Sequence, residues 1–332
     1  MKNFSLLKII LIALVVLAAC SLLEWRIFSA NNRTDNTSEC SEDGNYKYVN
    51  SWVACQLSER DLIKSFDALR YRIEDFVNYS LKEEKAKNIS VFMRDLKSRR
   101  WLGVNENENY SPASLLKLPL LIAYYELSEV QPDILLRKYI YRGQSSTPND
   151  IQDIKPESKL EEGKEYTSEE LLYRMIVYSD NETVGPLFNF IGSKYVNEIF
   201  TDLGIYVPVS GGMETDFLSP KIYAAIFRSL YNSIFLRPEN SEKILDLLTK
   251  TTFKDGLVAG VPEQITVAHK FGEREIKDSA TGSVIRNLYD CGIVYDPEHP
   301  YILCVMTRGQ DWENLKEIIK NISRLVYEEM KD

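Results

Sequence analysis

Histidine is scarce in this chain of 332 residues, which contains only His269 and His299. The chain therefore has too few histidines to make a Ser–His–Asp triad or a histidine-rich metal site a strong candidate. The five cysteines show no C-x-x-C spacing, so we expect neither a zinc site nor another metal or cofactor. Basic residues are also fewer than acidic ones: the net charge is −9, and the sequence contains no basic stripe. This charge argues against nucleic acid as a partner.

A long hydrophobic run is missing even at the N-terminus, where the apolar stretch Ile9–Ala19 is short. It has signal-peptide length and cannot span a bilayer alone. The stretch ends in Leu17-Ala18-Ala19-Cys20, which resembles a bacterial lipobox and implies lipidation of Cys20. A second possibility is an uncleaved membrane anchor, because residues 21–23 extend the apolar run. A third is secretion without membrane attachment. All three place the body outside the cytoplasm, and the first two attach it to the membrane.

The next segment, residues 21–57, has the composition of a polar tether rich in Asn, Ser and Asp. It contains Cys40 and Cys55, which we expect to form a disulfide in an oxidising compartment. Two unpaired surface thiols are the alternative. We place residues 1–20 as signal peptide or anchor and residues 58–332 as one domain, which we expect to be monomeric.

Hydrophobic periodicity in this domain predicts an α+β fold. We expect an antiparallel sheet of about five strands formed by both chain ends, flanked by helices and joined to an all-helical lobe. The predicted strands are 88–96, 101–104, 265–271, 288–295 and 301–307, and the predicted helices are 58–85, 111–125, 171–178, 184–190, 222–231, 239–251 and one that begins at Asp311. Residues 128–166 are expected to be irregular. Cys291 and Cys304, in neighbouring strands, are expected to be buried thiols rather than a disulfide, and His269 to pack within its strand.

The chemistry-bearing stretch is Ser114-Leu115-Leu116-Lys117. Ser111 and Pro112 have the order of an N-cap and a first helical residue, which would place Ser114 in the first turn. Lys117 follows on the same helix face, so a serine hydroxyl would lie beside an amine and near free backbone N–H groups. These are a nucleophile, a candidate base and half of an oxyanion hole. Because S-x-x-K arises often by chance, the pair needs support from elsewhere in the chain.

That support comes from two further motifs in a fixed order, Ser179-Asp180-Asn181 and Lys270-Phe271-Gly272. S-x-x-K, S-D-N and K-T-G are the signature of class A β-lactamases and penicillin-binding proteins, and this chain resembles that family. The segments 160–167 and 256–262 resemble the family's lead-ins to its second and third motifs. The resemblance covers residues 58–332. Taken alone, S-D-N would be only a helix-ending turn and Lys270 only a solvated charge.

The resemblance implies a role for each motif residue. Ser114 would be the acylated nucleophile, and Lys117 would take its proton if burial and the charge of Lys270 lower its pKa. Ser179 would relay that proton to the leaving nitrogen. Asn181 would hold the substrate amide, and Lys270 would steer the substrate carboxylate and support Ser179.

The family's remaining machinery is only partly present. The resemblance assigns Gly272 to the substrate-binding strand and the backbone N–H groups of Ser114 and Glu273 to the oxyanion hole. Phe271 stands where the family has a threonine whose hydroxyl binds the substrate carboxylate. No E-x-x-L-N segment, which supplies the family's deacylating glutamate, precedes Asp216. Glu214 is the one carboxylate inside that loop and is the candidate replacement for the deacylating glutamate.

The sequence therefore predicts a class A β-lactamase-like serine hydrolase that forms an acyl-enzyme at Ser114 with β-lactams or related amides and releases it slowly. One alternative is a penicillin-binding D,D-peptidase that acts on peptidoglycan stem peptides. The other is a catalytically weak binding protein of the cell envelope.

Overall fold

The computed structural model describes most of the predicted domain and two residues of the predicted tether. The described residues are 47–48, 66–143, 149, 152–210, 212–277 and 282–331. The signal or anchor segment, Cys20, Cys40 and Cys55 lie outside them. No helix within the described ranges has both the length and the apolar character to cross a membrane.

A five-stranded antiparallel sheet forms the centre of the fold, in the order β2-β1-β7-β6-β5. Its strands are β1 (Asn88–Asp95), β2 (Trp101–Val104), β5 (Thr266–Lys277), β6 (Val284–Tyr295) and β7 (Tyr301–Gly309). β1 pairs with β7, so the first and last strands of the chain lie side by side. This confirms the α+β prediction and the sheet built from both chain ends.

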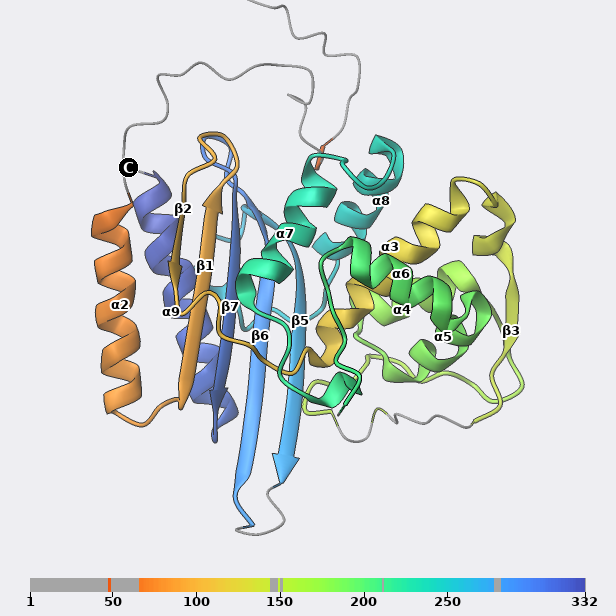
Figure 1. The fold of residues 1–332 in the computed structure, drawn as a ribbon, viewed down its shortest axis with the longest axis horizontal. Helices are drawn as coiled ribbons and strands as arrows, with labels where there is room; N and C mark the ends of the chain where they lie inside the picture. The colour runs from red at the N-terminus through yellow and green to blue at the C-terminus, as the bar shows by residue number, and fades with distance from the viewer. Residues whose placement is uncertain are drawn as a thin grey trace, which may run out of the picture. The chain divides into compact units, whose positions relative to one another are not determined.

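Alternate residues of β1, β5, β6 and β7 enter two different hydrophobic cores, as expected for a sheet covered on both faces. On β7, Leu303 and Val305 pack with helices α2 (Asp67–Lys82) and α9 (Trp312–Lys331). Ile302 and Met306 of the same strand join the core that contains helix α7 (Pro220–Tyr231). Figure 1 shows α2 beside α9, and the predicted apolar stripe of α9 faces the sheet.

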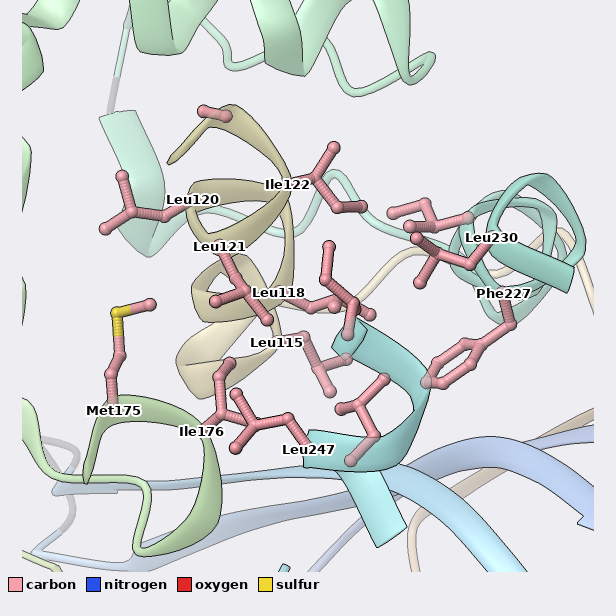
Figure 2. Packing of buried hydrophobic residues seen from close by; sticks show 14 of the residues in the cluster. Leu115, Leu118, Leu120, Leu121, Ile122, Met175, Ile176, Phe227, Leu230 and Leu247 are labelled. Carbon is pink, nitrogen blue, oxygen red and sulfur yellow. The ribbon is translucent and has the colours of Figure 1, made fainter. Parts of the chain in front are cut away.

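The helical lobe is built around α3 (Lys117–Ser128), whose residues 117–125 are all buried. Its other helices are α4 (Ser168–Val177), α5 (Val184–Ile191), α6 (Ser193–Asp202) and α8 (Pro238–Thr249). Figure 2 shows leucines at and before the start of α3 surrounded by Met175 and Ile176 of α4, Phe227 of α7 and Leu247 of α8. Burial on all sides fixes the start of α3, which carries the predicted base Lys117 and directly follows the turn with the predicted nucleophile Ser114.

The start of this helix differs from the prediction. Ser111 does not cap it, because the Ser111 hydroxyl accepts a hydrogen bond from Arg274 Nη1 at 2.6 Å. A 3-10 helix, η2 (Ala113–Leu116), comes first and leads directly into α3. Ser114 therefore lies in the 3-10 turn, and a contact to β5 has replaced the local cap.

The described part of the segment 128–166 is more regular than predicted. They contain a 3-10 helix, η3 (Pro132–Leu136), and the short strand β3 (Lys138–Ile140), which pairs with β4 (Glu165–Thr167). Helix α6 was also not predicted. The capping box that opens α4 has the expected form, with Thr167 and Glu170 bonded to each other's backbone N–H groups.

The expectation that Cys291 and Cys304 are separate thiols is wrong, because the structure joins them in a disulfide. The register of β6 and β7 places the two residues directly opposite each other. Directly opposed residues of an antiparallel pair have neighbouring Cβ atoms. Sequence placed the cysteines in adjacent strands but could not give this register.

Two residues of the predicted tether, Lys47 and Tyr48, lie against the body. Their backbone N–H groups donate to the carboxylate of Glu242 on α8 at 2.7 and 2.8 Å. The buried Tyr48 ring packs edge-on against Tyr295, whose hydroxyl donates to Tyr48 O. A point of attachment thus lies within the segment that composition marks as a tether.

Candidate active site

The three motifs meet beside a cavity of about 480 Å³ between the start of α3, the S-D-N turn and β5. Ser114, Lys117 and Asn181, one or two residues from each of the first two motifs, line this cavity, together with Glu273 of β5. Ser179 and Lys270 lie behind its wall and are fully buried. All predicted motif residues are therefore brought together, in two layers.

Ser114 is placed at the cavity by its neighbour in the 3-10 turn. Leu115 is fully buried, and its carbonyl oxygen accepts a hydrogen bond from the Tyr223 hydroxyl at 2.9 Å. Ser114 itself is 9% exposed, and among the described residues its hydroxyl has no hydrogen-bond partner. The hydroxyl is therefore held near a rigid core while its oxygen is left free for a ligand.

Lys117 has an unusual environment for an amine. Its Nζ donates to Ser179 O at 2.6 Å, to Ser179 Oγ at 3.1 Å and to Asn181 Oδ1 at 2.6 Å. Burial lowers the pKa of Lys117 to about 7, against the opposing effects of Asp180 and Glu273. Much of the lysine is then neutral near pH 7, which is the state that a general base requires.

Ser179 Oγ lies between two lysines. It accepts from Lys117 Nζ and also from Lys270 Nζ, which is 3.0 Å away. Burial, and then the nearby charge of Lys117, lower the pKa of Lys270 well below its ordinary value. The predicted relay hydroxyl is thus in contact with the predicted base and with the third motif.

The S-D-N turn is held by residues that the sequence did not reveal. The fully buried Asp180 accepts from Arg174 Nε at 3.0 Å and from Asn149 Nδ2 at 2.9 Å. Asn149 Oδ1 accepts from the backbone N–H of Asn181, and Gln152 Nε2 donates to Ser179 O. These contacts hold Ser179 at its positive φ of 53°. Asn149 and Gln152 stand in a polar stretch without periodicity, so no local signal marks them.

Strand β5 approaches the turn that carries the predicted nucleophile closely at Gly272. A Cβ there would lie 3.1 Å from Leu115 Cγ and 3.2 Å from Tyr289 Cδ2, so the glycine allows the strand to pack on the 3-10 turn. Phe271, in place of threonine, is fully buried against Phe253 with ring centroids 4.7 Å apart. It therefore serves the core and offers no hydroxyl to a substrate.

Glu273 has a role beyond its predicted backbone contact. Its side chain is buried, and Oε1 accepts from the backbone N–H of Ile154 at 3.0 Å. Burial raises the pKa of Glu273 to about 7. The prediction for this residue was limited to an oxyanion-hole N–H, because strand alternation does not reveal a partner in a distant loop.

Glu214, the candidate deacylating carboxylate, lies at the outer rim of the cavity. Its side chain is 83% exposed and pairs with Arg274 Nη2 at 3.3 Å. Arg274 Nη1 also donates to the Glu214 carbonyl oxygen. Among the described residues, only Arg274 contacts this carboxylate.

His269 packs in β5, as predicted. It is fully buried, and its Nδ1 lies 2.7 Å from Asp290 Oδ1 on β6. The other oxygen of Asp290 accepts from the backbone N–H of Leu257. The pair links the third-motif strand to the segment before it.

Comparisons with known proteins agree with this arrangement of sheet and helical lobe, which is the fold of class A β-lactamase-like serine hydrolases. The model of the family described as "Beta-lactamase enzyme family" matches residues 68–330. The chain therefore belongs to the beta-lactamase enzyme family. The comparison with curated proteins gives no match.

Solved structures with the same fold include both β-lactamases and a penicillin-binding protein. A mutant of PBP-A in an acyl-enzyme complex with penicillin-G is 22% identical, with a TM-score of 0.64 over 81% of this chain and 98% of that one. The TLA-3 extended-spectrum β-lactamase is 21% identical, with a TM-score of 0.67 over 81% and 100%. A class A β-lactamase representative from Bacteroides cellulosilyticus DSM 14838 is 20% identical, with a TM-score of 0.66 over 80% and 99%.

Proposed function

We propose that the protein forms an acyl-enzyme at Ser114 with β-lactams or related amides. The observation that carries this proposal is the Lys117 amine, which is buried, has a pKa of about 7 and lines the same cavity as Ser114. A base with a pKa near the working pH combines the correct protonation state with useful basicity.

The hydrogen bonds of Ser179 support a proton path through this residue. A neutral Lys117 keeps two donors and gains a lone pair that can accept the Ser114 proton. Ser114 Oγ then bonds to the carbonyl carbon, the carbon–nitrogen bond breaks, and the nitrogen leaves with a proton. Ser179, bonded to Lys117 Nζ at 3.1 Å, passes that proton from the lysine to the nitrogen, while Lys270 holds the Ser179 hydroxyl. The backbone N–H groups of Ser114 and Glu273 stabilise the oxyanion.

The site is less complete for the second half of the proposed reaction, the removal of the acyl group, than for acylation. It needs a water held by a base, and the rim carboxylate Glu214 is exposed and paired with Arg274. We therefore propose slow deacylation. This favours, as a second candidate, a penicillin-binding D,D-peptidase that acts on peptidoglycan stem peptides over a fast β-lactamase.

A fluorescent penicillin combined with intact-mass detection tests the proposal. We expect one covalent adduct on the wild-type protein, no adduct on Ser114→Ala and a normal adduct on the matched control Ser111→Ala. The structure of PBP-A in an acyl-enzyme complex with penicillin-G supports the choice of probe. An adduct that persists in Ser114→Ala would contradict the mechanism. No adduct on the wild type would favour the weak binding protein.

The proposed location is the outer side of a bacterial membrane, with Cys20 lipidated or residues 1–23 retained as an anchor. This rests on the sequence alone. Fatty-acyl labelling that is lost in Cys20→Ala would support the lipoprotein. Membrane association without labelling would favour the anchor.

A further inference from the structure

Two walls of the cavity beside Ser114 differ in their chemistry. One is charged and consists of Glu273, Arg274 and Glu275 of β5. The other, which we call the apolar wall, comes from η2, α3, α5, α6 and the 3-10 helix η6 (Gly212–Glu214). The large side chains of the apolar wall are Leu116, Leu120, Val184, Phe188, Phe200 and Met213. Because η2 packs on β5 and leads into α3, Ser114 lies where the two walls meet.

The apolar wall is built by helix periodicity. Leu116 and Leu120 are four residues apart across the start of α3, and Val184 and Phe188 are four residues apart on α5. Residues at this spacing lie on one face of a helix, so each helix presents an apolar pair to the cavity. Phe200 of α6 is 3% exposed and joins this wall to the core of the helical lobe.

The protein does not fully cover these side chains. Leu116, Val184 and Phe188 are half-buried, and Met213 is exposed. Single exposed apolar residues are common on protein surfaces, but these four line one cavity together. Apolar surface that water contacts in a cavity loses this contact when an apolar group of a ligand covers it, which favours binding. The apolar wall therefore has the character of a binding surface.

This wall begins at the motif residues that would hold and attack the substrate. Leu116 directly precedes Lys117, and Val184 follows Asn181 by three residues in the turn that continues into α5. Lys117 and Asn181 line the same cavity. A substrate whose side-chain amide is held by Asn181 would therefore have its acyl substituent close to Val184 and Phe188. The cavity volume of about 480 Å³ leaves room for such a substituent, since pockets for drug-sized ligands measure roughly 300–1,000 Å³.

We propose that the apolar wall is the subsite for the acyl substituent of the substrate, so that Ser114 is acylated fastest by amides whose acyl side carries a large apolar group. The inference rests on the proposed acylation of Ser114 and narrows its substrate class. An alkyl chain of medium length or an aryl group covers the wall, whereas a small substituent leaves it in contact with water.

The test compares two penicillins that share the reactive ring and the carboxylate and differ in the acyl group, acetyl against octanoyl. Below saturation, we expect the octanoyl compound to acylate the wild-type protein at least about tenfold faster by intact mass, because its additional methylene groups leave water at the apolar wall. The rates of alkaline hydrolysis of the two compounds correct for their intrinsic reactivity.

A matched pair of variants on α5 locates the effect. Phe188→Gln replaces a ring of the apolar wall by a polar side chain and should lower the octanoyl-to-acetyl ratio at least about threefold. Phe190→Gln makes the same change on the same helix, but the Phe190 ring packs against Tyr139, so the ratio should stay unchanged.

A second measurement on the wild type does not depend on a variant folding. Across a series of acetyl, butanoyl, hexanoyl and octanoyl penicillins, the acylation rate should rise with chain length. A rate that is flat or falls across this series, or a ratio that Phe188→Gln and Phe190→Gln change equally, would overturn the inference alone. No adduct with any compound of the series would overturn the proposed function as well.

Discussion

The inner and outer parts of the cavity are built in different ways. At the inner end, Lys117, Ser179 and Lys270 are buried, share hydrogen bonds and are held by an S-D-N turn that is itself bonded on several sides. At the rim, Glu214 is exposed and is held by a single arginine, Arg274. Burial shifts the lysine pKa values at the inner end, where acylation would take place.

This difference separates the two halves of the proposed reaction. Forming the acyl-enzyme uses only groups from the rigid inner end and the cavity wall. Removing it requires a positioned base, and the rim offers an exposed carboxylate. The contrast supports the proposed acylation with slow release, and the following changes test each side of it.

The largest effect is expected from Lys117→Met, which keeps the apolar stem and removes the amine. Without a base, acylation of Ser114 should fall by about a thousandfold or more. Stopped-flow labelling with a fluorescent penicillin measures the rate, and the exposed Lys194→Met serves as control. An acylation rate within tenfold of wild type would show that another group takes the proton.

The inner scaffold should also depend strongly on Arg174. Arg174→Met leaves the buried Asp180 carboxylate without its charged partner, which should lower the free energy of unfolding by about 3 kcal/mol. At the rim, Arg274→Met breaks the pair with the exposed Glu214 and the hydrogen bond to Ser111, and should cost about 1 kcal/mol. Urea denaturation measures the free energy of unfolding of both variants. Equal losses would contradict the difference between the inner end and the rim.

The pH dependence of acylation follows from Lys117. The lysine accepts a proton only when neutral, so the rate should rise about tenfold per pH unit below the pKa and level off above pH 7. A lysine with the ordinary value would give a rate that rises up to pH 10. A rise that continues well beyond pH 8 would contradict the assigned base.

The smallest effect is expected from Glu214→Gln. An exposed carboxylate paired with Arg274 is poorly placed to activate water, so the deacylation rate should change less than about twofold. The decay of the mass-labelled adduct measures this rate. A decay slowed tenfold or more would show that Glu214 is the replacement base and that the rim takes part in deacylation.

Much of the fold follows from local patterns in the sequence. The Thr167 capping box, the apolar stripe of α9 and the hairpin between β6 and β7 each have a signal within a few residues. The three motifs also predicted which parts of the chain meet at the cavity. These features depend on short-range preference and on ordered motifs, which a single sequence contains.

The errors share a different cause, since each depends on contacts between distant residues. The Cys291–Cys304 disulfide requires the exact register of two strands. The Ser111 hydroxyl, predicted to cap the helix, instead accepts a hydrogen bond from Arg274, which is 163 positions away in sequence. The Glu273 side chain accepts a hydrogen bond from the backbone N–H of Ile154, which lies in a loop that shows no periodicity.

Pre-steady-state hydrolysis of a chromogenic cephalosporin tests the central claim most directly. Rapid acylation followed by slow release predicts a burst of one equivalent of product per protein molecule, lost in Ser114→Ala, and then a much slower steady rate. A linear progress curve of rapid turnover without a burst would contradict the account, because deacylation would then be at least as fast as acylation.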